Sequence, residues 1–442
     1  MDSLTLYILT FNCARNFVDV DRFVHHFFDA FPLTDISSNS PPPDLIVLSL
    51  QEIAPIAYAF LGGSFLEPYF ATLALVVERA VSERWDAHYV NMVKDNSGMT
   101  GLMVYARSDV SERITSIDTA RVGFGFQQMG NKGAVGARLA YATHKNPDDT
   151  VDLTFVAAHL APMEYAVLRR NKDWRSIVER LVFDRATTKS RDNVQTGDDS
   201  ESTTLLQGST RSSGNDDRGI FIPTSYLFLA GDLNYRTSNV SPRKEDCARF
   251  PQAEVDPNDP RHFSHLLKED QLTREMQHSR SFHGLSEAPI TFPPTYKYTS
   301  AARQAATCEG ASQGWLWTST RWPSWCDRVL YLESLPGLGD QARVRPLVYK
   351  SLPLFPTSDH RAVALSVSIP VPSMQSADAA QPVIPFSIDP DWESKRDAAR
   401  RKEIVVGCLA YLGLTWEGNG LLIASVIGLL GAWLVLRSIF NA

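Results

Sequence analysis

An uncharged apolar run at residues 226–230 ends in Gly231, Asp232, Leu233 and Asn234. Such a run predicts a buried β-strand. Alternate residues at a strand end point to one side, so Asp232 and Asn234 can face the same cleft. An acid that takes a proton from water, beside an amide that orients the water, indicates a hydrolase. Gly, Asp and Asn are also common turn residues, so this stretch taken alone leaves a plain turn open.

The same arrangement recurs along the chain. Further strands are predicted at residues 4–11, 44–50, 100–107, 133–141, 151–158, 328–332 and 362–368. Polar residues adjoin many of these strands, namely Asn12, Gln51 and Glu52, His159, Asp327, and Asp359 with His360. Each has a plain explanation: a turn for Asn12 and Asp359-His360, a solvated strand end for Glu52, a hydrogen-bonded core histidine for His159. Because strand ends at one edge of a sheet sandwich converge, the repetition favours a single cleft.

Helical spacing of apolar residues predicts helices at residues 18–31, 70–85, 168–183 and 262–276. Strands alternate with helices in places and follow one another directly elsewhere. This order predicts an α/β fold, a four-layered sandwich of two packed β-sheets flanked by helices, over residues 1–370. Residues 186–219 are rich in Ser, Thr, Asp, Gly and Arg. We expect a disordered insert there, because so few apolar side chains cannot offset the cost of ordering.

Charge and cysteine content exclude several classes of protein. The formal net charge of −7 argues against a general nucleic-acid binder, which is usually basic. The five cysteines are scattered and form no CxxC pair, so the sequence supports neither a zinc site nor a disulfide framework. A reducing compartment is the corresponding expectation. Nothing in the sequence indicates a protein partner, and we expect a monomer.

The C-terminal region has a different composition. Residues 420–436 carry no charge, and with residues 437–440 they are just long enough to cross a bilayer. We expect a linker with a basic cluster at 371–403 and a membrane anchor at 404–442, with the main span at about 420–440. The basic residues of the cluster favour a cytosolic N-terminal side; they are Lys395, Arg396, Arg400, Arg401 and Lys402. The expected location is the endoplasmic reticulum membrane, tail-anchored, with the catalytic domain in the cytosol.

Two alternatives remain for the hydrophobic segments. The last helix could pack on the domain, although its apolar character all round argues against this. Residues 404–416 are too short for a full span and could be interfacial, re-entrant or one arm of a hairpin. A second apolar stretch, residues 56–61, follows Glu52 closely. It could dip into a bilayer beside the cleft or belong to the core.

The polar residues at the strand ends suit metal-assisted phosphoryl transfer. Mg²⁺ prefers oxygen ligands and takes one or two protein carboxylates, which Glu52 with Asn12 or Gln51 can supply. Asp232 can activate a water that Asn234 positions. The phosphoryl group needs cationic or N–H donors, and His159, His360, Asn234 and Lys132 are the candidates. His360 in turn needs a carboxylate to hold its tautomer, and Asp327 is the expected partner.

These residues lie in motifs that resemble inositol polyphosphate 5-phosphatases, within the superfamily of endonuclease/exonuclease/phosphatase enzymes. The resemblance covers residues 4–370 approximately. The matching stretches are Phe11-Asn12, Gln51-Glu52, Gly130-Asn131-Lys132-Gly133, His159-Leu160 with Arg170-Asn171-Lys172-Asp173, Gly231-Asp232-Leu233-Asn234-Tyr235-Arg236, Phe292-Pro293-Pro294-Thr295-Tyr296-Lys297-Tyr298, Pro323-Ser324-Trp325-Cys326-Asp327-Arg328 and Ser358-Asp359-His360-Arg361.

The resemblance implies roles for individual residues. Asn12 and Glu52 would hold Mg²⁺, with Asp359 close to the ion. Asp232 and Asn234 would act on the attacking water, while His159 and His360 contact the scissile phosphate and Asp327 pairs with His360. Tyr296, Lys297 and Arg321 resemble residues that grip the neighbouring 4-phosphate; Lys132 and Arg328 complete the predicted substrate-binding set. Ser319 departs from the pattern, because some members carry a second basic residue there.

The sequence therefore predicts a Mg²⁺-dependent phosphoinositide 5-phosphatase. Its expected substrate is phosphatidylinositol 4,5-bisphosphate at a membrane, with other 5-phosphorylated inositides as further candidates, hydrolysed by in-line attack of an activated water. A nuclease or sphingomyelinase of the same superfamily is the alternative enzyme, and Tyr296-Lys297-Tyr298 speaks against it. A membrane tether without activity would have lost metal or water-positioning residues, and all of those named above are present.

Overall fold

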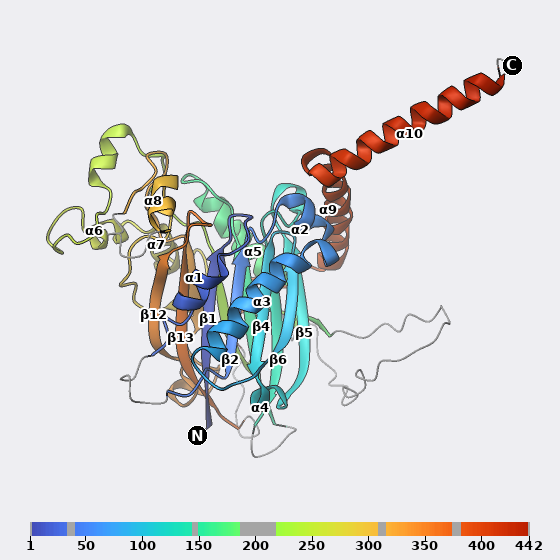
Figure 1. The fold of residues 1–442 in the computed structure, drawn as a ribbon. Helices are drawn as coiled ribbons and strands as arrows, with labels where there is room; N and C mark the ends of the chain where they lie inside the picture. The colour runs from blue at the N-terminus through green and yellow to red at the C-terminus, as the bar shows by residue number, and fades with distance from the viewer. Residues whose placement is uncertain are drawn as a thin grey trace.

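The computed structural model describes residues 2–32, 40–143, 149–185, 218–307, 315–373 and 382–440. Two β-sheets pack face to face with helices outside them, which confirms the predicted four-layered sandwich (Figure 1). Within the described residues one sheet has six strands, in the order β12-β13-β1-β2-β4-β3. The other has seven, in the order β10-β11-β9-β7-β6-β5-β8.

The strands of the first sheet are β1 (Asp2–Asn12), β2 (Leu45–Gln51), β3 (Tyr89–Ser97), β4 (Thr100–Arg107), β12 (Arg345–Leu354) and β13 (Arg361–Val371). Those of the second are β5 (Ile114–Gly123), β6 (Gly133–Ala142), β7 (Thr150–His159), β8 (Asp184–Arg185), β9 (Ser225–Asp232), β10 (Leu285–Glu287) and β11 (Asp327–Leu332). The α-helices are α1 (Val20–His26), α2 (Ile56–Leu61), α3 (Glu67–Ser82), α4 (Ser108–Ser111), α5 (Val167–Arg180), α6 (Phe263–Leu267), α7 (Gln271–Gln277), α8 (Ser300–Ala305), α9 (Trp392–Leu414) and α10 (Trp416–Phe440).

The main core lies between the two sheets. Leu6 and Ile8 of β1 belong to the same buried cluster as Leu153 and Phe155 of β7. The opposite faces of the central strands are covered by helices, so every residue of β2 and of β9 is buried. Strands buried on both faces appear as continuous apolar runs, which explains why the sequence pattern located them.

Several elements differ from the sequence prediction. The expected helix at 262–276 is wrong: the structure has two short helices, α6 and α7, because Asp270 caps a new helix by accepting a hydrogen bond from the Thr273 amide. The predicted helix at 18–31 shortens to α1. Strands β3, β5 and β12 are absent from the prediction, since solvent-facing polar residues interrupt their apolar pattern. The expected insert falls outside the described residues, apart from its last positions, 218 and 219.

The region after the sandwich also departs from the expected linker. Strand β13 continues to Val371, and residues 392–403 form the first half of helix α9. This part of the linker prediction is wrong, because α9 packs against α2 instead of remaining extended. Residues 374–381 lie outside the described part of the chain. Residues 56–61 form α2, in which Phe60 is fully buried.

Helix α10 projects away from the body of the molecule (Figure 1). Among the described residues it is the one helix long and apolar enough to cross a membrane. In its most apolar stretch of 18 residues, no residue is buried inside the structure. At 1.5 Å per residue it measures about 37 Å, against about 30 Å for the hydrocarbon core of a bilayer. The alternative of a last helix packed on the domain is therefore wrong in this structure.

Candidate active site

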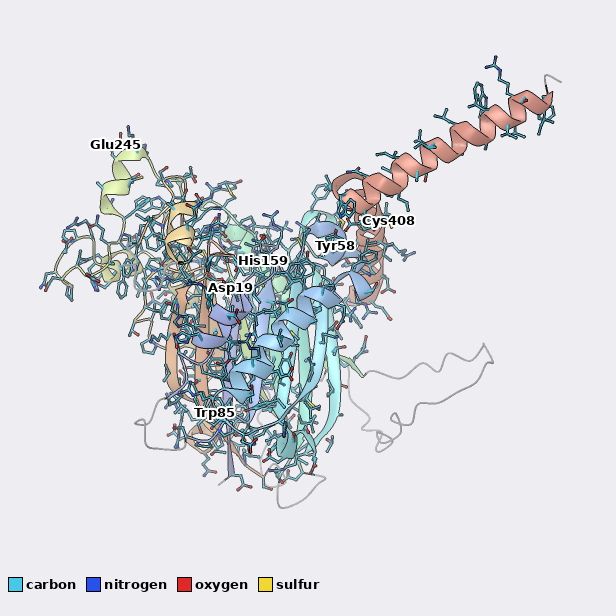
Figure 2. The ribbon with its side chains drawn as sticks, viewed as in Figure 1. Asp19, Tyr58, Trp85, His159, Glu245 and Cys408 are labelled. Atoms are coloured by element: carbon cyan, nitrogen blue, oxygen red, sulfur yellow. The ribbon has the colours of Figure 1, made fainter. Side chains whose placement is uncertain are left out.

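Three polar residues meet where neighbouring strands of the second sheet end. In the strand register His159 of β7 lies opposite Asp232 of β9, and Asp327 of β11 lies opposite Asp232 from the other side. Figure 2 shows His159 toward the end of the sandwich where α9 meets α10. The structure thus brings these strand ends to one edge, as the sequence pattern predicts.

The first sheet contributes residues to the same edge. Asn12 ends β1, Glu52 follows β2, and His360 precedes β13. The Asn12 Nδ2 donates a hydrogen bond to the Asp232 Oδ2 at 3.0 Å, which joins the two sheets across the sandwich. The site is therefore formed by segments more than two hundred residues apart in sequence.

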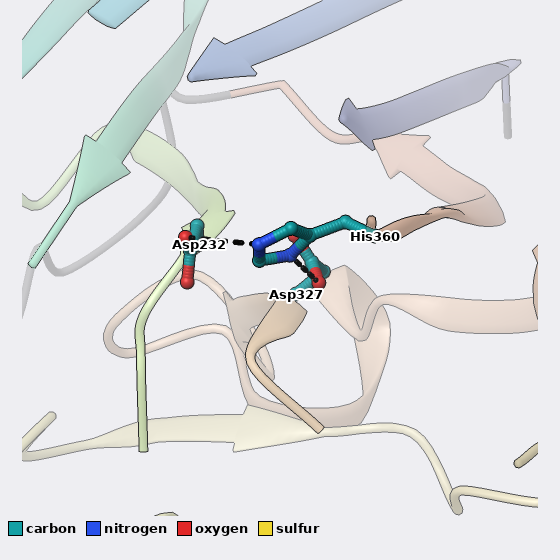
Figure 3. Close-up of side chains that lie close together, drawn as sticks. All are labelled: Asp232, Asp327 and His360. Atoms are coloured by element: carbon teal, nitrogen blue, oxygen red, sulfur yellow. Dashed lines mark hydrogen bonds and ion pairs between the residues drawn. The ribbon is translucent and has the colours of Figure 1, made fainter. Parts of the chain in front are cut away.

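Asp232 is the centre of the cluster. Its Oδ2 lies 3.2 Å from the His159 Nε2 and 4.0 Å from the His360 Nε2, the contact drawn in Figure 3. Its Oδ1 accepts the Asn234 amide at 3.1 Å. Burial alone would raise the pKa of Asp232, but the His159 hydrogen bond and the neighbouring positive charges hold that pKa well below its ordinary value. Asp232 is therefore ionised and can only accept hydrogen bonds.

His360 is held by a buried carboxylate. Its Nδ1 lies 2.9 Å from the Asp327 Oδ2 (Figure 3). The Thr295 hydroxyl donates to the same oxygen at 2.7 Å. Burial lowers the pKa of His360, but the Asp327 charge and hydrogen bond outweigh it and leave the pKa raised. The predicted pair is present, and it favours the imidazolium form with Nε2 toward Asp232.

The carboxamide of Asn234 has a fixed orientation. Asn234 adopts a left-handed backbone with φ of 57°. Its Nδ2 donates to the Leu160 carbonyl at 3.1 Å, and its Oδ1 accepts from the Arg236 Nη2 at 2.5 Å. The Arg236 guanidinium also lies over the Tyr296 ring, 4.4 Å from its centroid. An amide nitrogen carries two donors, so one remains for a water or a phosphate oxygen beyond the bond to Leu160.

Lys132 brings a cation to the cluster. Its Nζ contacts the His159 Nε2 and lies 3.9 Å from the Glu52 Oε1. Burial lowers the pKa of Lys132, and burial together with the Lys132 charge lowers the pKa of His159. The lowered pKa of His159 favours its neutral imidazole, so the two neighbouring histidines take different protonation states.

Glu52 and Asn12 offer oxygen ligands suited to Mg²⁺. Glu52 has a left-handed backbone with φ of 45°, and its carboxylate faces the Arg15 Nε at 3.1 Å. The Asn12 Oδ1 accepts from the Ala14 amide at 3.0 Å. The donor chemistry fits a hard cation. The Asp359 Oδ2, also predicted near the metal, lies 2.8 Å from the Lys297 Nζ and is neutralised by that cation.

A second grouping, Asp232, Asp327 and His360, has ligand atoms within 4.8 Å of one another. It suits a metal less well, because histidine must lose its proton to ligate and Asp327 favours the protonated imidazole of His360. Both side-chain oxygens of Asp232 also already accept hydrogen bonds. The residues therefore favour the Glu52 side of the cluster for a metal.

Four of the five predicted substrate residues lie near the cluster; they are Lys132, Tyr296, Lys297 and Arg321. The Tyr296 ring lies 4.5 Å, centroid to centroid, from the His360 ring, and Lys132 reaches His159. The Lys297 side chain, 37% exposed, is accessible to a ligand. The Arg321 Nη2 lies 3.4 Å from the Met163 sulfur, and its Nε is 4.0 Å from the Glu164 Oε1.

Arg328 is the exception, and its predicted substrate role is wrong. Its guanidinium is completely buried, with Nη1 3.0 Å from the Asp270 Oδ2 and Nε 2.6 Å from the Glu287 Oε1. Successive residues of a strand face opposite sides, so Arg328 points away from the side to which Asp327 projects. Arg328 instead ties β11 to β10 and to the start of α7.

A surface hollow adjoins the cluster. It has a volume of about 430 Å³ and is lined by residues that include Phe126, Asn131, Lys132, Pro162 and Arg169. Phe126 is 70% exposed at this place. A ligand that reaches Lys132 can therefore extend over a surface that combines basic and apolar side chains.

Three functional contacts were not assigned from the sequence. Arg236 orients Asn234, Thr295 donates to Asp327, and Arg15 faces Glu52. Arg236 and Thr295 lie inside motifs quoted above, so their positions could have been singled out. Their partners could not, because each contact depends on how distant strands pair.

Comparisons with known proteins show which family this chain resembles. The family model described as Endonuclease/Exonuclease/phosphatase family 2 matches residues 9–366. "Type I inositol polyphosphate 5-phosphatase 13" of Arabidopsis thaliana is 28% identical over 338 residues, 72% of this chain and 27% of that protein. "Polyphosphatidylinositol phosphatase INP53" of Saccharomyces cerevisiae is 27% identical over 73% of this chain and 23% of that protein. The chain thus spans about a quarter of the length of these two relatives.

A solved structure shows the same fold. It is the inositol polyphosphate 5-phosphatase domain of SpSynaptojanin, in complex with inositol (1,4)-bisphosphate and a calcium ion. The two structures superpose with a TM-score of 0.56 at 22% identity, over 91% of this chain and 90% of that one. The chain belongs to the endonuclease/exonuclease/phosphatase family 2, and within that family it is similar to an inositol polyphosphate 5-phosphatase and a polyphosphatidylinositol phosphatase.

Proposed function

We propose that this protein is a metal-dependent phosphoinositide 5-phosphatase that hydrolyses the 5-phosphate of phosphatidylinositol 4,5-bisphosphate at a membrane. The observation that carries the proposal is the buried, ionised Asp232, which lies between His159 and His360 and is bonded to Asn12. A carboxylate held ionised beside a histidine that favours its charged form and a lysine suits attack on a phosphoryl group. The names of the relatives support this substrate class, since both printed names are of inositide phosphatases.

In the proposed reaction one water attacks phosphorus and the bond from phosphorus to the inositol oxygen breaks. The electron pair passes to the inositol oxygen, which takes a proton from solvent to become a hydroxyl group. Asp232 accepts the proton of that water, and Asn234, fixed by Arg236, orients the water. Lys132 and His360 donate to the oxygens on which negative charge develops. A Mg²⁺ ion held by Glu52 and Asn12 would supply further charge stabilisation at the phosphate when bound.

The substrate class can be tested directly. Phosphate release is measured with Mg²⁺ across a panel of phosphoinositides and matched soluble inositol phosphates. Strand cleavage of a single-stranded DNA and phosphocholine release from sphingomyelin are measured in parallel. We expect release from 5-phosphorylated inositides, highest for the 4,5-bisphosphate, and none from inositides without a 5-phosphate. Cleavage of DNA or sphingomyelin without inositide hydrolysis would replace this proposal by the alternative enzyme class.

Lys297 is expected to set the preference for a phosphate beside the scissile one. Its ammonium is partly exposed and its only ion-pair partner among the described residues is Asp359. Lys297→Ala should lower kcat/KM on the 4,5-bisphosphate about tenfold more than on a lipid that carries the 5-phosphate alone, because a single charged hydrogen bond contributes about 1.5–3 kcal/mol. Both substrates are compared in the same mixed micelles. An equal loss on both would show that Lys297 serves the scissile group or the fold.

We further propose that α10 anchors the protein in the endoplasmic reticulum membrane, with the sandwich on the cytosolic side. The support is the apolar helix that leaves the body of the molecule and the basic residues in the helix before it. Juxtamembrane Lys and Arg residues favour the cytosolic side and are attracted to anionic lipid, at about 1 kcal/mol per residue near the surface.

Removal of residues 416–442 should give a soluble enzyme, while α9 stays in place on α2. We expect an almost unchanged rate on a short-chain soluble substrate and loss of the protein from the membrane fraction after alkaline carbonate extraction. The full-length chain is the control. If it is washed off the membrane by carbonate, or if the shortened chain does not fold, α10 does not act as an anchor.

A further inference from the structure

Helix α9 is closely docked on the body of the molecule. The Arg400 guanidinium donates to the Phe60 carbonyl at 2.7 Å and to the Leu61 carbonyl at 3.1 Å, and so satisfies carbonyls at the end of α2. A Cβ atom added at Gly407 would lie 3.0 Å from the Phe60 Cβ, so the two helices approach as closely as a glycine allows. The basic start of this helix is therefore part of the globular structure.

One acidic side chain of α9 reaches beyond α2. Glu403 is buried, and its Oε1 accepts the backbone N–H of Gly130 at 2.7 Å. Its Oε2 lies 3.1 Å from the Arg400 Nη1, which fixes the carboxylate from the other side. A hydrogen bond from a buried amide to an ionised carboxylate is among the stronger kinds in proteins.

Gly130 belongs to the loop that carries Lys132. The Gly130 carbonyl accepts the Met99 amide at 2.9 Å, so the residue is held by α9 on its N–H and by the β3–β4 turn on its carbonyl. A Cβ atom at Gly130 would lie 2.8 Å from the Gly98 nitrogen. Two residues further, the Lys132 side chain contacts His159 and faces Glu52. The position of Lys132 thus depends on what holds Gly130, together with the Phe124 and Gly125 amides, which both donate to the Lys132 carbonyl at 3.0 Å.

We propose that Glu403 is a positioning residue of the active site, which holds the 130–132 loop so that Lys132 faces the scissile phosphate. The inference rests on the proposed 5-phosphatase function for its activity readout. It also makes α9 the connection between α10 and the active site, since α9 ends at Leu414 and α10 begins at Trp416. Helix α10 then follows a helix that contacts the 130–132 loop of the active site, instead of following a flexible linker.

The plain alternative is that Glu403 only stabilises the docked helix. In that case its replacement would lower the melting temperature without a specific effect on turnover. The two possibilities separate through Glu403→Gln, which keeps a side-chain oxygen for the Gly130 amide but removes the charge, and Glu403→Ala, which removes both. Glu393→Ala, at an exposed acidic position of α9, is the matched control.

The experiment uses the full chain in detergent micelles and a short-chain 4,5-bisphosphate. For Glu403→Ala we expect kcat to fall on the order of tenfold to a hundredfold, because a small displacement of a catalytic group has such an effect. Hydrogen exchange of the segment around Gly130 should be faster. Glu403→Gln should recover most of both quantities, and Glu393→Ala should match the wild type. If Glu403→Ala does not fold, Glu403→Asp, whose carboxylate is withdrawn by one methylene, should show the same two changes.

Other outcomes would overturn the proposal. Wild-type kcat in Glu403→Ala or in the Asp variant would show that the loop holds Lys132 without help from α9. An equal loss in the Ala and Gln variants, with unchanged exchange around Gly130, would assign the effect to charge instead of position. If the wild type releases no phosphate from any inositide, the proposed function fails. The exchange measurement then still decides whether Glu403 holds the Gly130 amide.

Discussion

Asp232→Asn should reduce turnover of a 5-phosphorylated inositide by about 10²- to 10⁴-fold, the range typical for loss of a general base. Asp232 accepts hydrogen bonds from Asn12, His159 and the Asn234 amide. An asparagine of the same shape keeps one oxygen but places an NH₂ group against donors, and it cannot take a proton from water. Among the described residues, loss of the charge also leaves the His360 imidazolium with Asp327 as its remaining carboxylate contact of 4 Å or less.

Substrate binding should change much less than turnover in this variant. The measurements are kcat and KM on a short-chain 4,5-bisphosphate, together with calorimetric binding of the same lipid. Asp152→Asn, at the opposite end of strand β7, is the matched control and should retain activity. Normal turnover by Asp232→Asn would remove the general-base assignment. A loss of affinity as large as the loss of rate would assign Asp232 to binding or folding.

Glu52→Gln should reduce activity on the order of a hundredfold or more at limiting Mg²⁺, because a metal at the phosphate contributes several kcal/mol to transition-state stabilisation. A neutral carboxamide is a weaker ligand for a hard cation than a carboxylate. The strand end itself should survive, since the Glu52 carbonyl still accepts the Arg15 amide at 2.7 Å.

The distinguishing measurement is a Mg²⁺ titration of phosphate release. Glu52→Gln should require a higher Mg²⁺ concentration for half-maximal activity and recover part of its rate when the ion is in excess. Glu67→Gln, an exposed residue paired with Lys94, is the control and should titrate as the wild type does. Full activity of the wild type in excess chelator would show that the reaction needs no metal. An unchanged titration in Glu52→Gln would place the metal elsewhere.

The central strands were accessible to sequence analysis because burial on both faces leaves a continuous apolar run. Strands β2, β4, β7 and β9 were located within one or two residues of their observed ends. Edge and half-exposed strands such as β3 and β12 were not, since solvent tolerates polar residues on their open faces. The same limit explains the single helix predicted at 262–276, where a capping aspartate starts a new helix.

Arg328 and Glu403 are two residues whose contacts could not be predicted from motifs or from composition. Arg328 stands beside Asp327 in the sequence, yet the strand pleat turns it to the other side, where it is buried against Asp270 and Glu287. Glu403 lies in a basic stretch that suggested only a linker, but its side chain holds the Gly130 amide. Neither contact leaves a local pattern, because each is formed by segments far apart in the chain.

The sequence by itself determined the types of residue in the site, the strand ends on which they stand, and an apolar C-terminal segment long enough for a bilayer. These properties depend on local pattern, and pattern repeats every two residues in a strand. Only the tertiary structure decided which residues are partners. Asp232 lies between His159 and His360, Arg236 donates to Asn234, and Glu403 of α9 accepts a hydrogen bond from the 130–132 loop. The physical reason is that protonation and orientation depend on neighbours within a few ångströms, and those neighbours are chosen by strand register and packing.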